Sequence, residues 1–427
     1  MRFRQALAEL DARQPERMVP DLTRIRALAD LLNEPQLAYP SVHVTGTNGK
    51  TTTARLTGRV LCAHGLTAGV YTSPHLSSVT ERIALCDEPI SEDEFAEEYE
   101  RLLPYLAEVD RRGEPVTYFE ALTALAYLWF ADKPVGVGVF EVGMGGTWDA
   151  TNLVAGDVAV LCPIALDHPE LGSTITEVAT EKAGIIKPGK LAVVREQPPE
   201  AYGVVRDRAR EVGATLLVEG RDWELAGRLQ GVGGQVLSVR GLHETYRDLR
   251  LALFGSHTAR NVAAAVVAAE ALIDRPLKQE ILADALTGAA TPGRLEVVGR
   301  HPLVVLDGAH NPAGARALAQ ALPEAFSWDD LHVVLAASSN KDVEGIACEL
   351  GALSPLTVVP TRNSSARSAP AQRVAEAVRS AGLVATEPRK SVEEAIDAAR
   401  SAAGPTDLIL ITGSLYTVAD ARRALVT

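Results

Sequence analysis

Short apolar runs alternate with longer amphipathic segments along most of this chain. The short runs are rich in β-branched residues and predict strands, at residues 42–44, 68–71, 136–141, 158–161, 191–194 and 215–218. Segments with a helical pattern lie between them, at residues 52–64, 120–130, 176–183 and 199–212. Strands that alternate with helices predict a parallel sheet with crossover helices, and therefore an α/β fold.

A change in this pattern divides the chain. Residues 236–254 form two extended stretches around a polar turn, which predicts a hairpin at the edge of the main sheet. Two helices are expected next, at 256–273 and 277–287. A break follows at 291–296, and the alternation of strands and helices then restarts. We therefore predict a large N-terminal domain with a mostly parallel sheet at residues 1–296 and a smaller C-terminal Rossmann-like α/β domain at residues 297–427.

The composition is that of an ordinary globular protein. Of 427 residues, 47% are hydrophobic and 23% are charged, which allows two or three domains with ample cores. No apolar run reaches the roughly 18 residues of a membrane span, and the N-terminus lacks the long apolar region of a signal peptide. The net charge of −13 argues against a broad nucleic-acid-binding surface. These observations predict a cytoplasmic protein that binds neither membranes nor nucleic acid.

The four cysteines are scattered and form no C-x-x-C pair; they are Cys62, Cys86, Cys162 and Cys348. This spacing is typical of buried thiols in a reducing cytoplasm. We therefore expect neither disulfides nor a zinc site.

A glycine-rich loop follows the first predicted strand and precedes a predicted helix, which is the context of a phosphate-binding loop (P-loop). Backbone N–H groups at such a loop point at anionic oxygens. Lys50 can reach the β- and γ-phosphates of a nucleotide, and the Thr51 hydroxyl can bind Mg²⁺. The residues expected to hold the nucleotide are Gly46, Thr47, Asn48, Gly49, Lys50, Thr51 and Thr52. The alternative is a glycine turn that ends in Lys-Thr, since the two glycines are closer together than in the common motif.

Three further residues could complete a metal site beside this loop. Glu141 ends a predicted buried strand, where ligands gather in open α/β sheets, although a helix cap or salt bridge is the alternative. His168 follows another strand and is a candidate Mg²⁺ or Mn²⁺ ligand, although a lone histidine is more often structural. Lys182 could react with CO₂ to form a carbamate, an anionic oxygen ligand; a salt bridge with Glu181 or with a substrate is the alternative.

Weaker candidates lie elsewhere in the chain. The Ser73 hydroxyl could complete a magnesium shell, and Arg82 could hold a carboxylate or stabilise a loop. Beyond the predicted break, Asp307 follows a strand and could accept hydrogen bonds from ribose hydroxyls, while Arg294 could neutralise phosphate. None of these residues predicts a function by itself.

Taken together, these motifs resemble folylpolyglutamate synthase/dihydrofolate synthase, a family of the Mur ligase superfamily. The resemblance runs in the same order through nearly the full length of the chain. Its motifs lie at residues 45–51, 72–76, 117–120, 141–152, 166–168, 181–187, 292–296, 307–312 and 412–416. The motifs characteristic of the folate branch are those at 72–76, 119–120, 141–152 and 307–311.

Two positions depart from the family's usual pattern. Thr51 and Thr52 follow Lys50, where this branch often has Gly-Ser. Thr147 and Trp148 stand where the family usually has Arg-Leu. The first departure keeps a hydroxyl next to the lysine, and the second concerns pterin recognition and leaves the catalytic carboxylate unchanged.

The resemblance implies an ATP-dependent ligase that adds L-glutamate to dihydropteroate, to (tetrahydro)folate and its polyglutamates, or to both. An acyl phosphate would be the intermediate, and the Thr-x-Phe-Glu segment at 117–120 favours a bifunctional enzyme. Two metals and Lys50 would neutralise charge on the transferring phosphoryl group. The implied partners are small molecules, and the family suggests a monomer.

The resemblance also assigns roles residue by residue. The catalytic groups would be Lys50, Glu141, His168 and Lys182. The first Mg²⁺ site would use Thr51, Ser73 and Glu141, and the second Glu141, His168 and carbamylated Lys182. Nucleotide contacts outside the loop would be Asn261, Arg294 and Asp307. Residues for folate or glutamate would be Thr117, Phe119, Asp149, Ala150, His310 and Ser414, and Arg82 is a further substrate candidate from its sequence context.

Two other functions are the alternatives. A peptidoglycan-type Mur amino-acid ligase would act on a UDP-sugar peptide and would not need the segment at 117–120. A P-loop ATPase or kinase that switches a partner protein would not explain the motif at 307–312.

Overall fold

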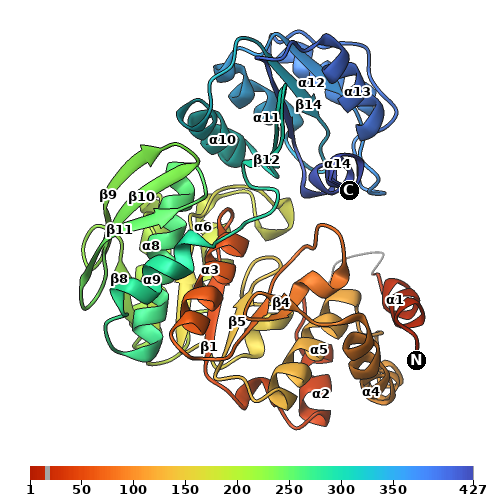
Figure 1. The fold of residues 1–427 in the computed structure, drawn as a ribbon. Helices are drawn as coiled ribbons and strands as arrows, with labels where there is room; N and C mark the ends of the chain where they lie inside the picture. Colours follow the sequence, from red (N-terminus) through yellow and green to blue (C-terminus); the bar gives the residue numbers. More distant parts are fainter. Residues whose placement is uncertain (15–19, 427) are drawn as a thin grey trace. The chain divides into compact units, whose positions relative to one another are not determined.

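The structure is a computed structural model that describes residues 1–14 and 20–426, which fall into two compact units (Figure 1). The first unit comprises Met1–Gly227, Leu237–Leu249 and Arg260–Thr287, and the second comprises the remaining segments, Arg228–Val236, Arg250–Ala259 and Gly288–Thr427. The chain thus passes between the units several times, whereas the sequence pattern placed a single boundary after residue 296. That domain boundary stays a prediction.

The main sheet of the first unit has eight strands in the order β4-β3-β2-β5-β1-β6-β7-β8. The six strands from β2 to β8 in this order run parallel, and β3 and β4 extend the sheet as antiparallel strands. The bounds are β1 (Ser41–Thr45), β2 (Ala68–Tyr71), β3 (Ile83–Leu85), β4 (Glu88–Pro89), β5 (Val137–Glu141), β6 (Val158–Leu161), β7 (Leu191–Val194) and β8 (Thr215–Val218). β1, β5 and β6 are buried along their whole length, as expected for parallel strands covered on both faces. The predicted α/β fold with a mostly parallel sheet is therefore confirmed.

Helices pack around this sheet in three groups. α3 contacts β1, β2, β5 and α9; α1, α2, α4 and α5 pack together; and α6 packs against α7. Their bounds are α1 (Phe3–Asp11), α2 (Thr23–Leu31), α3 (Lys50–Ala63), α4 (Glu92–Asp110), α5 (Tyr118–Asp132), α6 (Ile175–Ala183), α7 (Pro199–Val212), α8 (Ser256–Ile273) and α9 (Gln279–Thr287). The large apolar side chains under α4 and α5 form one core, which includes Phe95, Tyr99, Tyr127, Phe130 and Phe140.

The predicted edge hairpin at 236–254 is wrong. These residues belong to a separate three-stranded sheet, β9 (Glu224–Gly231), β10 (Gly234–Arg240) and β11 (Thr245–Leu251), in the order β11-β10-β9. Every second residue of β10 is buried, so this small sheet has one apolar face of its own and does not need to extend the main sheet. β9, the first strand of this small sheet, could not be predicted from an apolar pattern because it is mostly polar and partly exposed.

The second unit is built on a five-stranded sheet in the order β12-β13-β16-β14-β15. Its strands are β12 (Glu296–Arg300), β13 (Leu303–Leu306), β14 (Leu331–Leu335), β15 (Thr357–Pro360) and β16 (Leu408–Thr412). β12 is an antiparallel edge strand where the sequence suggested part of a linker, and the other pairings are parallel. The helices are α10 (Pro312–Ala325), α11 (Val343–Leu350), α12 (Ala371–Ser380), α13 (Val392–Ala402) and α14 (Leu415–Leu425). This smaller mixed α/β domain agrees with the predicted fold class.

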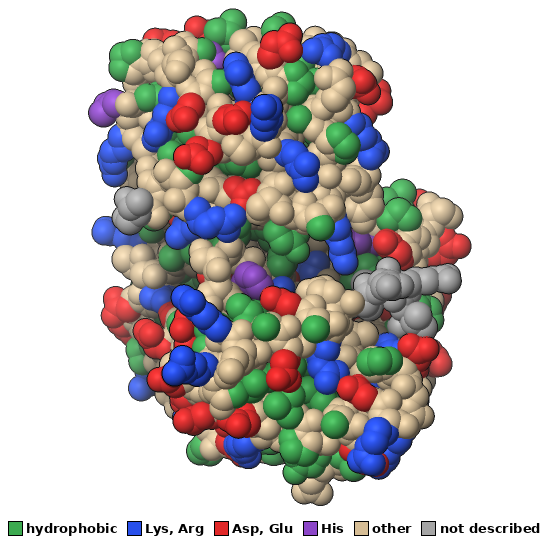
Figure 2. Space-filling view, turned by 90° about the vertical axis from the view of Figure 1, so that its right-hand side faces the viewer, with side chains coloured by type: hydrophobic (Ala, Val, Ile, Leu, Met, Phe, Trp, Pro, Cys, Tyr) green, Lys and Arg blue, Asp and Glu red, His purple; other side chains and the backbone are tan. Residues whose placement is uncertain are grey.

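The surface carries both signs of charge, and none of the helices in the described ranges has the length and apolar character needed to cross a membrane. On the face drawn in Figure 2, Lys and Arg side chains lie among Asp and Glu side chains.

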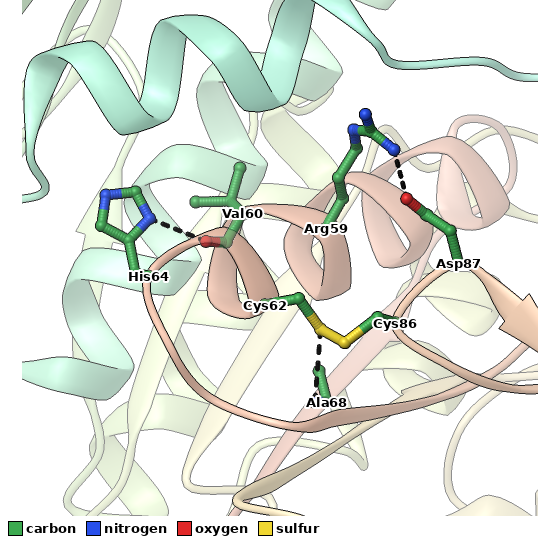
Figure 3. Close-up of a disulfide and its surroundings, with 7 residues drawn as sticks. All are labelled: Arg59, Val60, Cys62, His64, Ala68, Cys86 and Asp87. Carbon is green, nitrogen blue, oxygen red and sulfur yellow. Dashed lines mark hydrogen bonds and ion pairs between the residues drawn. A yellow bond between two sulfur atoms is a disulfide. The ribbon is translucent and has the colours of Figure 1, made fainter.

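Two of the cysteines form a disulfide, so the expectation of four buried thiols is wrong (Figure 3). Cys62 lies near the end of α3, Cys86 lies between β3 and β4, and their sulfurs are 2.05 Å apart. Ala68 lies between them, because its N–H is 3.4 Å from Cys62 Sγ and its carbonyl oxygen accepts from the Cys86 N–H at 2.7 Å. Sequence spacing could not reveal this pairing. Cys162 is buried as expected, whereas Cys348 is exposed.

We expect Cys62→Ser to be less stable than the wild type under non-reducing conditions. The disulfide joins residues 24 positions apart, and a cross-link of this size contributes about 3 kcal/mol by restricting the unfolded chain. Urea unfolding with and without reductant measures the effect. Reductant should lower the unfolding free energy of the wild type but not that of the variant.

Cys348→Ser is the matched control, since this exposed thiol has no disulfide partner. It should respond to reductant as the wild type does. The prediction would be contradicted if the wild type had the same unfolding free energy with and without reductant.

Candidate active site

The P-loop connects β1 to α3 at the carboxyl end of the main sheet. Gly46 and Gly49 have φ angles of 144° and 89°, which glycine adopts without strain. A Cβ at Gly46 would lie 2.5 Å from the Cβ of Cys162, so no larger residue fits there. Thr47 fixes the loop from the other side, because its hydroxyl donates to the Ala165 carbonyl oxygen at 2.8 Å and accepts the Ala165 N–H at 2.9 Å.

Lys50 begins α3 and folds back over this loop. Its Nζ donates to the carbonyl oxygens of Gly46 and Thr47 at 3.0 and 3.2 Å. The ammonium therefore lies against the loop, where it could meet a bound phosphate.

Glu141, at the end of β5, joins Thr51 and Ser73. The Thr51 hydroxyl donates to Glu141 Oε1 at 2.7 Å, and the Ser73 backbone N–H donates to Oε2 at 2.9 Å. The carboxyl is 1% exposed; this burial raises its pKa, and the charge of Lys50 opposes the rise. The three residues predicted for the first metal site thus lie together. The Thr51 hydroxyl and the Glu141 carboxylate are oxygen donors of the kind that Mg²⁺ prefers, and the adjoining Ser73 carries a further hydroxyl, so these residues fit the ion.

Lys182 is buried against the same loop. Its Nζ donates to the Gly46 carbonyl oxygen at 2.8 Å, and the residue is 4% exposed. Burial and the charge of Lys50 lower the Lys182 pKa to about 7. A large fraction of this amine is therefore neutral near neutral pH, which is the form that reacts with CO₂. Its neighbour Glu181 holds a second glycine-rich loop, residues 143–149, and accepts the Trp148 N–H at 3.1 Å.

His168 lies in the loop after β6 and is partly exposed. Its Nε2 is 3.3 Å from Asp167 Oδ2, and its Nδ1 is 3.9 Å from Glu170 Oε2. Asp167 has a side chain that is only 6% exposed, and its charge acts on Lys182. Asp167 was not predicted from the sequence, although its place next to His168 was a usable signal. Within the described residues no three His, Cys, Asp or Glu side chains form a metal-binding group, and the second metal site stays a prediction.

Phe119 and Asp149, two predicted pterin residues, meet at this second glycine-rich loop, residues 143–149. A Cβ at Gly143 would lie 2.6 Å from Phe119 Cζ and 3.2 Å from Asp149 Oδ2. Asp149 accepts the Met144 N–H at 2.9 Å and the Thr151 hydroxyl at 2.5 Å. Burial raises the pKa of this carboxyl. The carboxylate is thus held rigidly beside an aromatic ring.

The other candidates in the first unit have structural contacts. Thr117 and Glu120 cap α5 reciprocally, with the Thr117 N–H and hydroxyl both 2.8 Å from the Glu120 carboxylate. The Ala150 carbonyl oxygen accepts a buried tyrosine hydroxyl at 2.8 Å. Arg82 donates from Nε to His75 Nδ1 at 2.9 Å, and burial together with the Arg82 charge lowers the His75 pKa to about 4. Their roles in substrate binding stay predictions.

Asn261, on α8, lies against the phosphate loop. A Cβ at Gly49 would be 2.7 Å from its Oδ1. Asn261 is more than 200 positions away from this loop in the sequence, which does not explain their contact. In the fold, α8 positions Asn261 at the loop.

The second unit places Arg294 beside Asp307. Asp307 follows β13 and is 5% exposed, and its two carboxylate oxygens accept the N–H groups of Leu295 at 3.0 Å and Ala309 at 2.8 Å. Burial raises the Asp307 pKa, and the Arg294 charge opposes this. His310 Nδ1 lies 3.0 Å from the Gly308 carbonyl oxygen.

Ser414 is buried at the start of α14, where its hydroxyl accepts the Tyr416 N–H at 3.2 Å. This contact is a helix cap, and a role toward glutamate stays a prediction.

Two protein-family profiles match most of the chain. The Mur ligase middle domain matches residues 44–269, and the Mur ligase glutamate ligase domain matches residues 293–415. The phosphate loop and Glu141 lie within the first match, and Asp307 lies within the second. The fold and the site therefore define a Mur ligase.

Comparison with similar proteins identifies the family within the Mur ligases. The chain is 40% identical to the dihydrofolate synthase/folylpolyglutamate synthase of Mycobacterium tuberculosis, over 97% of this chain and 92% of the relative. The corresponding Bacillus subtilis protein is 33% identical over 95% of each chain. The structure of Mycobacterium tuberculosis folylpolyglutamate synthase complexed with ADP is 38% identical and matches with a TM-score of 0.95, covering 100% of this chain and 98% of that one. A solved structure of an FPGS–AMPPCP–folate complex (FPGS, folylpolyglutamate synthase) is 32% identical to this chain. It matches with a TM-score of 0.88 and covers 100% of both chains.

The chain belongs to the folylpolyglutamate synthase/dihydrofolate synthase family, whose members are ATP-dependent ligases. The resemblance identified from the motifs is therefore confirmed. Neither a peptidoglycan-type ligase nor a switch kinase is supported by these relatives.

We expect Glu141→Gln to lower the rate of Mg²⁺-dependent ADP release by at least about 100-fold, since even outer contacts of metal ligands account for 10- to 100-fold effects. The amide keeps the shape of the side chain and removes a buried charge, so the fold should be retained. Steady-state turnover and thermal unfolding test this together. A folded variant with near-normal rates would show that Glu141 is structural.

Proposed function

We propose that this protein adds L-glutamate to dihydropteroate and to reduced folates, including their polyglutamates, with conversion of ATP to ADP and phosphate. One observation supports this most directly: Glu141 joins Thr51 and Ser73 beside the phosphate loop, in a chain that matches folate ligases over nearly its full length. Both of these relatives bear the names of both activities. Phe119 and Asp149, which we propose to contact the pterin, lie together beside Gly143.

The chemistry proceeds in two transfers. The γ-phosphoryl group moves from ATP to a carboxylate oxygen of the folate substrate, which gives an acyl phosphate and ADP. The amino group of glutamate then attacks the acyl carbon, the bond from that carbon to the phosphate oxygen breaks, and an amide forms with loss of a proton. Lys50 and the N–H groups of the phosphate loop bind the phosphates during the first transfer.

Thr51, Ser73 and Glu141 would hold one Mg²⁺, and Glu141, His168 and carbamylated Lys182 a second. Bound Mg²⁺ supplies positive charge that stabilises the transferring phosphoryl group. Residues proposed to contact the nucleotide outside the loop are Asn261, Arg294 and Asp307. Those proposed for folate are Arg82, Thr117, Phe119, Asp149 and Ala150, and those for glutamate are His310 and Ser414. A monomeric state and a cytoplasmic location complete the proposal.

An ADP-release assay tests the substrate class. We expect ADP release with dihydropteroate and with tetrahydrofolate only when L-glutamate is present, because the acyl phosphate needs the amine to turn over. A UDP-muramoyl peptide should give no stimulation. Equal ADP release without pterin and without glutamate would contradict the ligase function.

We expect Lys182→Ala to lose most activity, and bicarbonate should not restore it. In the wild type, carbamate formation should increase between pH 6 and pH 8, because the Lys182 pKa of about 7 makes the neutral amine more abundant as pH rises. Carbon-13 NMR with labelled bicarbonate measures the carbamate, with Lys182→Ala as the blank.

Lys182→Arg is the matched control for charge, since its guanidinium stays protonated and forms no carbamate. It should be as inactive as Lys182→Ala. Turnover like that of the wild type in Lys182→Arg would exclude the carbamate.

A further inference from the structure

Arg195 is buried at the carboxyl edge of the main sheet, immediately after β7. Its side chain is 4% exposed, and an isolated buried charge is costly, so it needs partners. Glu219 Oε2 lies 3.2 Å from Arg195 Nε, and Asn261 Oδ1 accepts from Arg195 Nη1 at 2.5 Å. Arg195 therefore links a buried carboxylate to a residue that lies against the phosphate loop.

The strand register explains this placement. The last residues of β1, β6, β7 and β8 pair with one another. The next residues along these strands consequently form one row at the edge of the sheet: Gly46, Cys162, Arg195 and Glu219. This row runs from the phosphate loop to the Arg195–Glu219 ion pair.

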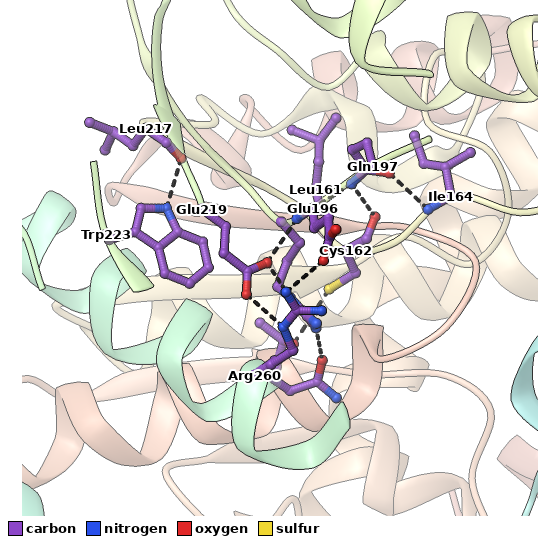
Figure 4. Close-up of polar contacts among 12 residues, drawn as sticks. Leu161, Cys162, Ile164, Glu196, Gln197, Leu217, Glu219, Trp223 and Arg260 are labelled. Carbon is purple, nitrogen blue, oxygen red and sulfur yellow. Dashed lines mark hydrogen bonds and ion pairs between the residues drawn. The ribbon is translucent and has the colours of Figure 1, made fainter. Parts of the chain in front are cut away.

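Glu219 has further partners, which hold its carboxylate in place (Figure 4). Its Oε1 accepts from Arg260 Nε at 2.9 Å, and its Oε2 accepts the Glu196 N–H at 2.8 Å. The Glu219 side chain is 5% exposed, so these interactions are little screened by water. The carboxylate is held from three sides, and the guanidinium is held with it.

The bond from Arg195 determines how the Asn261 amide is turned. Arginine donates and cannot accept, so it must face Oδ1, and the Nδ2 donor then points away from it. The amide lies over Gly49, where a Cβ would be 2.7 Å from Oδ1 and 3.1 Å from Nδ2. Two N–H donors are thereby oriented beside the phosphate loop.

We propose that Arg195 is a positioning residue for nucleotide binding, which holds the Asn261 amide so that Nδ2 donates to an acceptor on the bound nucleotide. Glu219 keeps Arg195 in place for this task. The inference rests on the proposed role of Asn261 as a nucleotide contact. Arg195 itself would act on the nucleotide through Asn261, to which it donates, while Glu219 holds its guanidinium.

Calorimetric titration with ADP tests the inference without turnover. Arg195→Ala and Asn261→Ala should each weaken ADP binding about tenfold, which corresponds to one good hydrogen bond. The double variant should bind no more weakly than Asn261→Ala, because both changes remove the same interaction. Additive losses, or a single variant with wild-type affinity, would overturn the inference.

Two variants separate orientation of the amide from general disturbance. Arg260→Met removes one of the three contacts that hold Glu219 but leaves the Glu196 N–H and Arg195 contacts, so it should cost less ADP affinity than Arg195→Ala. Asn261→Asp keeps an acceptor for Arg195 but has no N–H donor, so it should bind ADP as weakly as Asn261→Ala. A loss in Arg260→Met equal to that in Arg195→Ala, or full affinity in Asn261→Asp, would overturn the inference.

Arg195→Lys covers the case in which Arg195→Ala does not fold. Lysine keeps the positive charge beside Glu219, but its single terminal nitrogen cannot reproduce the two-sided contact of the guanidinium. ADP binding should weaken, and the KM for ATP should rise while kcat stays within about twofold; unchanged ADP affinity would overturn the inference. Failure of the proposed ligase function would give a different result. The wild type would then bind ADP but would show no glutamate-dependent ADP release.

Discussion

The buried carboxylate of Glu141 is the contact on which the arrangement of this site depends. It lies at the end of β5, next to β1 in the parallel sheet, and receives the Thr51 hydroxyl and the Ser73 N–H on its two oxygens. The start of α3 and the segment after β2 are thereby tied to one group. Because the parallel strands end at the same edge, the loops that follow them meet around this carboxylate.

Charged side chains lie around the phosphate loop, and their surroundings shift the pKa of Lys182 and of Glu141. Lys50 and Lys182 both donate to the Gly46 carbonyl oxygen, and two ammonium groups at such distances repel each other. Burial, and after it the charge of Lys50, lowers the pKa of Lys182, whereas burial raises the pKa of Glu141. A lysine that can lose its proton near neutral pH is suited to become an anionic ligand, which a surface lysine is not.

Much of this could be predicted from the sequence, because the relevant signals are local. Buried parallel strands appear as apolar β-branched runs, and the phosphate loop and Glu141 stand directly after such runs. The disulfide, the first strand of the small sheet, and Arg195 could not be predicted in this way. Cys62 and Cys86 are brought together across the start of β2. β9 has too few apolar residues to be recognised as a strand. The position of Arg195 next to Glu219 follows from the strand register. Pairing between distant segments is a property of the fold that no single segment contains.

The central claim is that a phosphoryl group is transferred to the carboxylate of the folate substrate before glutamate is added. Isotope transfer tests this most directly: dihydropteroate with oxygen-18 in its carboxylate is turned over with ATP and glutamate, and the released phosphate is analysed by mass spectrometry. The account predicts one labelled oxygen in the phosphate for each amide formed. Unlabelled phosphate accompanying amide formation would contradict it.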